Sequence, residues 1–135
     1  MLKIQVGHSY FLRYDPKQWE RGKPYPPLAT IQVAALLREM GHELTLFDAM
    51  LAEGVEEYAG ALDAAAPDLV VLYEDNFNYL TKMCLSRMRD AACQMIAEAR
   101  ASGARVIVAG SDASDQPEAF LAAGADAVLV GEGIA

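Results

Sequence analysis

Short apolar segments alternate with longer helical segments along this chain, and that alternation limits the folds it can adopt. Runs rich in Val, Leu and Ile predict five strands, at residues 2–6, 43–47, 69–73, 105–109 and 127–130. The segments between them predict helices at 28–40, 56–66, 82–101 and 115–123. Strands that are apolar on both faces and separated by helices are typical of a parallel sheet covered on both sides.

Local signals support several of these boundaries. Pro27 suits the start of the first long helix and Gly41 suits its end. Asp115, followed three residues later by Glu118, predicts a cap at the start of the last helix. Right-handed crossovers between five strands favour a flavodoxin-like (Rossmann-like) three-layer α/β/α sandwich with a five-stranded parallel sheet of order 2-1-3-4-5. We expect residues 1–135 to form this single domain.

Composition and charge exclude several classes of protein. Hydrophobic residues make up 53% of the chain and charged residues 22%, which is the balance of a globular core and too apolar for intrinsic disorder. No apolar run approaches the ~18 residues of a membrane span, and no secretory signal opens the chain. We therefore expect a cytoplasmic protein with no membrane partner. The formal net charge of −8 argues against a nucleic-acid partner, which requires a basic surface.

The charge is unevenly distributed. Residues 1–25 hold five basic and two acidic side chains, whereas the rest of the chain is strongly acidic. This basic segment is either a solvated loop or a contact for a phosphate or an acidic neighbour. Cys84 and Cys93 lie on opposite faces of one predicted helix, ~13 Å apart along its axis. We expect two free thiols there, and neither a disulfide nor a shared metal site.

In a sheet of this kind, ligands bind beyond the carboxyl ends of the strands. His8 follows the first strand, where it is either a loop residue or a ligand, and His42 is expected at the opposite edge as a surface or strand-entry residue. The segment after the first strand also carries five aromatic residues, which either cover a large flat ligand or pack against another domain: Tyr10, Phe11, Tyr14, Trp19 and Tyr25.

Several familiar site patterns are missing at the carboxyl edge. The first strand is not followed by G-x-G-x-x-G, and no G-x-S-x-G is present. The long aromatic loop is unlike the short phosphate loop of a flavodoxin, and the acidic pair and lysine of a phospho-receiver domain are missing. What remains are small-residue loops at 110–111 and 131–133, where glycine lets a ligand approach the backbone closely.

The order of these motifs resembles the N-terminal cobalamin-binding domain of B12-dependent radical SAM enzymes over nearly the whole chain. The matching motifs are Pro-Pro-Leu at 26–28, Leu-Arg-Glu-Met-Gly-His at 37–42, Pro-Asp-Leu-Val at 67–70, Gly-Ser-Asp-Ala-Ser at 110–114 and Asp-Ala-Val-Leu-Val-Gly-Glu-Gly at 126–133. The resemblance implies a module that holds base-off cobalamin at the carboxyl edge without a protein histidine ligand, because Met50 stands where the D-x-H-x-x-G motif has histidine.

The resemblance and the edge rule together predict eight cofactor-binding residues and no catalytic or metal-ligating ones: Asp48, Tyr73, Asn76, Gly110, Ser111, Gly131, Glu132 and Gly133. For Asp48 the alternative is a cap of the loop after the second strand, and Glu132 either orients a backbone amide or faces the barrel. The resemblance further implies a radical SAM barrel in cis, whose [4Fe–4S] cluster and S-adenosylmethionine belong to a catalytic domain that these residues do not include. The parent would be a methyltransferase or a related B12-dependent enzyme, and no catalysis is expected from this chain alone.

Three positions depart from the family pattern. Ala109 replaces a glycine, Asp112 stands where histidine is common, and Ile134 replaces the final acid. They leave an alternative open, namely a degenerate domain of the same type that binds no cofactor and serves in docking or substrate shaping.

Overall fold

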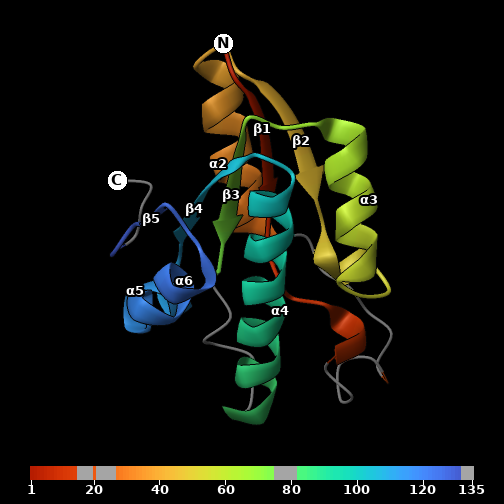
Figure 1. Ribbon diagram of the computed structural model, residues 1–135, viewed down its shortest axis with the longest axis vertical. Coiled ribbons are helices and arrows are strands. Elements are labelled where there is room, and N and C mark those ends of the chain that lie inside the picture. Colours follow the sequence, from red (N-terminus) through yellow and green to blue (C-terminus); the bar gives the residue numbers. More distant parts are fainter. Residues whose placement is uncertain (15–19, 21–26, 75–81, 132–135) are drawn as a thin grey trace.

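The computed structural model describes residues 1–14, 20, 27–74 and 82–131 (Figure 1). Its strands are β1 (Lys3–Gly7), β2 (Glu43–Phe47), β3 (Leu69–Tyr73), β4 (Arg105–Ala109) and β5 (Ala127–Val128). All of them run parallel in one sheet of order β2-β1-β3-β4-β5. The predicted flavodoxin-like α/β arrangement is confirmed, and the carboxyl ends of the strands share one edge.

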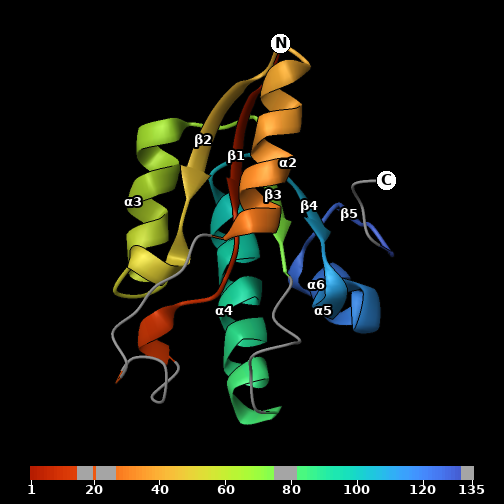
Figure 2. The ribbon, with the colours of Figure 1, turned by 180° about the vertical axis from the view of Figure 1, so that it is seen from behind.

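Helices cover both faces of this sheet. They are α2 (Leu28–Glu39), α3 (Glu56–Ala65), α4 (Lys82–Ala101), α5 (Ser111–Asp115) and α6 (Pro117–Ala123), with 3-10 turns η1 (Leu12–Tyr14) and η2 (Ala49–Leu51). Helix α2 lies on one face and α3 and α4 on the other (Figures 1 and 2). The right-handed crossover rule explains this, because only the β1–β2 connection runs in the opposite direction across the sheet.

Two apolar clusters fill the space between the layers. On the α3–α4 face, Val70 and Leu72 of β3 pack against Met95 and Ile96 of α4. On the α2 face, Val71 joins a smaller cluster from β1 and α2. Alternate residues of β3 thus bury their side chains on opposite faces, as expected for a central parallel strand. None of the helices in the described ranges is long and apolar enough to span a membrane.

The predicted cap at Asp115 is wrong. Asp115 is the last residue of α5, and Gln116 caps α6 without a side-chain hydrogen bond. Two residues explain the difference. Gly110 turns the chain at φ 110°, so a helix begins at once after β4. Pro117 then disfavours helical geometry at Gln116, whose φ is −130°, and the predicted helix is divided in two.

The fifth strand is shorter than predicted. Pairing of β5 with β4 ends at Val128, although the Leu129 N–H still donates to Val108 O at 2.8 Å. Beyond it, the Gly131 N–H donates to the Ser114 hydroxyl instead of to a strand. The Ser114 side chain of α5 therefore binds the chain at the point where the predicted strand would continue.

Acidic side chains at the amino edge of the sheet accept hydrogen bonds from the backbone of the strands. Asp68 accepts from the Lys3 N–H at 3.0 Å, and Asp126 accepts from the Val106 N–H at 2.8 Å and from Arg100 at 2.5 Å. The hydrogen bond from Val106, aided by Arg100, lowers the pKa of Asp126. His42 lies at this edge as predicted, half-buried, with Nδ1 3.2 Å from the Leu2 nitrogen.

Cys93 is a half-buried free thiol, as predicted, and burial raises its pKa. The side chain of Cys84 lies outside the described residues.

Candidate functional site

Polar residues from four separate segments meet at the carboxyl edge. His8 and Ser9 follow β1, Asp48 follows β2, Glu74 follows β3 and Asp112 lies just after β4. Of these side chains, only Asp48 is more than slightly exposed. The edge is therefore organised by contacts between loops that are far apart in the sequence.

His8 joins the ends of β1 and β2. Its Nδ1 accepts from the Tyr10 N–H at 3.1 Å, so the ring proton lies on Nε2, which donates to Asp48 Oδ1 at 2.9 Å. Asp48 Oδ1 also accepts from the Met50 N–H at 3.0 Å and thereby caps η2. Both nitrogens of His8 are engaged within the protein, so the histidine serves as a connector in this structure.

Ser9 joins the ends of β1 and β3, the point at which the strand order reverses. The Ser9 hydroxyl donates a short hydrogen bond to Glu74 Oε2, and both residues are fully buried. Glu74 also affects Tyr58 of α3, since burial raises the pKa of Tyr58 and the charge of Glu74 raises it further. A buried carboxylate thus lies where doubly wound sheets usually hold a ligand.

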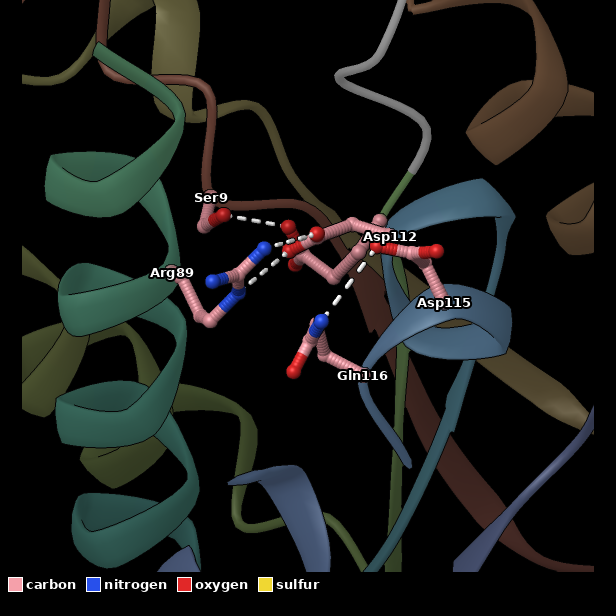
Figure 3. Close-up of polar contacts among 6 residues, drawn as sticks. Ser9, Arg89, Asp112, Asp115 and Gln116 are labelled. Carbon is pink, nitrogen blue, oxygen red and sulfur yellow. Dashed lines mark hydrogen bonds and ion pairs between the residues drawn. The ribbon is translucent and has the colours of Figure 1, made fainter. Parts of the chain in front are cut away.

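Arg89 of α4 neutralises a second buried acid. Its Nη2 atom lies 2.6 Å from Asp112 Oδ1 and its Nε atom 3.2 Å from Asp112 Oδ2, so that two hydrogen bonds join the guanidinium to the carboxylate (Figure 3). The side chain of Asp112 is 1% exposed and that of Arg89 is 24% exposed. The hydrogen bond to Asp112 raises the pKa of Arg89. Two-point contacts of this kind fix orientation as well as charge, so the pair holds α5 against α4.

Gly110 lets the ends of β3 and β4 approach each other closely. A Cβ at this position would overlap the backbone of Glu74, 2.5 Å from its carbonyl carbon and 2.8 Å from its nitrogen. The same stretch carries two hydrogen bonds, from the Glu74 N–H to Ala109 O at 2.6 Å and from the Asp112 N–H to Glu74 O at 3.1 Å. The space that glycine leaves here is filled by the protein's own backbone.

Ser114 connects the loops after β4 and β5. Its hydroxyl donates to Gly110 O at 2.9 Å and accepts from the Gly131 N–H at 2.9 Å. Gly131 has φ 104°, and no atom of the described residues lies within 4 Å of where its Cβ would be. In contrast to Gly110, this glycine is exposed and is not covered by any of the described residues.

Four of the eight predicted site residues can be placed together. Asp48, Tyr73, Gly110 and Gly131 lie at the ends of strands along the carboxyl edge, with Tyr73 buried at the end of β3. Ser111 begins α5, and its side chain lies outside the described residues, as do Asn76, Glu132 and Gly133 entirely.

The described aromatic residues of the first loop pack within the protein and do not form an exposed surface that could cover a ligand. Tyr10 and Phe11 are 4% and 0% exposed, and the Phe11 ring lies 5.0 Å from that of Tyr14 and 6.2 Å from that of Phe47. They pack in the protein's own core because the chain turns back into η1 directly after Ser9. Trp19 and Tyr25 lie outside the described residues. Arg13, from the same basic segment, lies 3.9 Å from Glu53 in a largely exposed pair.

Sequence reasoning missed Ser9, Glu74, Arg89 and Ser114 as site residues. The one available signal was position, since Glu74 directly follows the strand at 69–73 and Ser114 lies just after the strand at 105–109. Within the described part of the chain, no group of three His, Cys, Asp or Glu side chains could hold a metal ion. No protein-family model matches the chain, and a search of curated proteins found no match either.

Proposed function

We propose that this domain is a binding module that holds base-off cobalamin at the carboxyl edge of its sheet, as part of a radical SAM enzyme. The observation that carries the proposal is the platform formed by Ser114 and Gly131. Ser114 fixes the loop after β5 against the loop after β4, and among the described residues no side chain covers the backbone of Gly131 beside it. A bulky planar group requires such close access to backbone.

The residues present also fit a corrin without a protein ligand to cobalt. Both nitrogens of His8 are engaged, by Tyr10 and Asp48, so this histidine keeps the edge rigid and leaves the metal to other ligands. Backbone amides near Gly131 and the hydroxyl of Ser111 would bind the amide and nucleotide groups of the cofactor. When bound, cobalamin would supply a methyl carrier for the parent enzyme, and the domain would position it.

A second function is favoured by the closed contacts at the strand reversal. Ser9–Glu74 and Arg89–Asp112 place two buried acidic side chains there, and each of them is hydrogen-bonded within the protein. Side chains that are already engaged with one another leave fewer polar groups for a cofactor to bind. A domain of this type that binds no cofactor would act in docking or in shaping a substrate site.

Visible spectroscopy separates the two functions. The full chain is mixed with hydroxocobalamin, passed through a desalting column and scanned for corrin absorbance. Retained corrin with a base-off spectrum supports the cobalamin module, whereas complete loss of corrin would reject it in favour of docking. Gly131→Asn, which inserts a side chain at the platform, should reduce retention. Gly41→Asn is the matched control, because Gly41 also has a positive φ and open space but lies at the amino edge.

A further inference from the structure

The outer side of β2 is an open hydrogen-bonding edge in the part of the chain that the structure describes. There, β2 has one neighbouring strand, β1, and the Glu43 N–H donates to Leu2 O on that side at 3.0 Å. Because successive residues of a strand direct their backbone groups to opposite sides, Leu44 and Leu46 direct theirs away from the sheet. Natural edge strands are usually blunted by Lys, Pro, a bulge or shortness. β5 is blunted by being two residues long, whereas β2 has five residues, no Pro and no Lys, and its one charged side chain, Glu43, stands at its first residue.

Apolar side chains flank this edge on one face. Leu46 is 47% exposed and Ile31 of α2 is 40% exposed. A groove of about 260 Å³ between α2 and β2 is lined mainly by apolar residues, together with one basic and one hydroxyl side chain: Ile31, Ala34, Ala35, Arg38, Leu44, Thr45 and Leu46. Leu28, one turn before Ile31 on the same side of α2, is 66% exposed. The backbone edge and the apolar groove therefore form one continuous surface.

We propose that this surface binds a second copy of the same chain, with β2 paired antiparallel to the partner's β2 across a two-fold axis. In a parallel pair the two strands make unequal sets of hydrogen bonds, which a two-fold axis cannot relate, whereas the antiparallel pair is a closed two-fold interface. The dimer would contain one continuous ten-stranded sheet.

The hydrogen bonds of β2 select one register. The His42 N–H is already donated to Leu37 O at 3.3 Å, and Asp48 O already accepts from the Leu51 N–H at 3.2 Å. Leu44 and Leu46 thus remain as the residues whose outward groups pair. Leu44 of one copy faces Leu46 of the other in two doubly bonded pairs, and Thr45 lies opposite its own counterpart on the axis.

Side-chain chemistry agrees with this register. The leucines of the two copies meet on the α2 face, and the exposed Thr45 pair meets on the other, where Thr–Thr pairs are favourable. Glu43, the only charged residue of β2, would lie ~13 Å from its counterpart, four residues along the strand. That exceeds a Debye length of ~8 Å, so like charges do not oppose the pairing. Helix α2, which packs on β1 and β2, would lie about 10 Å from α2 of the second copy. That is near the usual packing distance between helices.

Light scattering after gel filtration tests the interface on the full chain. We expect twice the chain mass of 14.6 kDa. Leu46→Lys should reduce the mass to that of a monomer, since it places a charge among the partner's leucines. Leu121→Lys is the matched control, because Leu121 is 49% exposed on α6, away from β2, and that variant should stay dimeric. A monomeric wild type, or a dimer that Leu46→Lys leaves intact, overturns the proposal.

Disulfide trapping tests the register. Thr45→Cys should cross-link spontaneously in air, since directly opposed residues of a non-hydrogen-bonded pair lie ~4.5 Å apart at Cα. Glu43→Cys should not cross-link above the background set by Cys84 and Cys93. Equal cross-linking of both variants, or of neither, contradicts the two-fold axis at Thr45.

Discussion

Replacing Gly110 with alanine should remove a large share of the stability of this fold. Gly110 has φ 110° and ψ 177°, a conformation almost exclusive to glycine that costs other residues about 1–3 kcal/mol. A Cβ there would also lie 2.5 Å from the carbonyl carbon of Glu74, and relieving such overpacking costs about 1–3 kcal/mol more. The combined loss, about 2–6 kcal/mol, is a major part of the ~5–15 kcal/mol typical of a folded domain.

Urea unfolding followed by circular dichroism measures this loss, with two glycines as controls. Gly41 shares the positive φ but has no neighbour within 4 Å, so Gly41→Ala should lose only the backbone part. Gly60 lies inside α3 with nothing within 4 Å, and Gly60→Ala should gain about 0.5–1 kcal/mol. If Gly110→Ala unfolds at the same urea concentration as Gly41→Ala, the close contact between β3 and β4 is not rigid and the reasoning fails.

Three further predictions concern the contacts of the edges. Arg89→Met leaves the buried carboxylate of Asp112 without its partner and should lower the free energy of unfolding, measured in urea, by ~3–5 kcal/mol. Adding Asp112→Leu should restore most of that loss, and no recovery would contradict the pairing. The pKa of Asp126 is lowered below its usual 3.8, so its ionised form stabilises the fold above about pH 4. That stabilisation is lost as the pH falls through the lowered pKa. Asp126→Asn should therefore weaken the pH dependence of the urea midpoint below pH 4. Ser114→Ala should speed hydrogen exchange of the Gly131 amide up to about tenfold, the effect of one hydrogen bond, and unchanged exchange would refute the bridge.

Strand and helix positions could be predicted where burial determines them. β3, β4 and α4 begin and end at the predicted residues. Each is strongly apolar on the faces it buries, and Pro67 or Gly103 interrupts the pattern nearby. Helix α5 could not be foreseen, because it depends on how Gly110 packs against Glu74, which a local pattern does not contain.

The carboxyl edge was predictable as a place but not as a set of contacts. Strand order places Asp48 and Gly131 there, as expected. The partners of the buried acids were not foreseeable, because Ser9 and Glu74 are 65 residues apart and Arg89 and Asp112 are 23 apart. Nothing in a single sequence states which base or hydroxyl will meet which acid once the strands are assembled.

The central position of β1 has a consequence for synthesis of the chain. β1 is made first, yet it lies between β2 and β3, and its residues Ile4 and Gln5 pair with Leu69 and Val70 of β3. The nascent chain therefore holds its first strand with one neighbour at most until residue 73 has left the ribosome. During that interval the apolar edge of β1 is open to misplaced pairing. Slower translation once residue 73 has left the ribosome would favour correct insertion of β3 beside it.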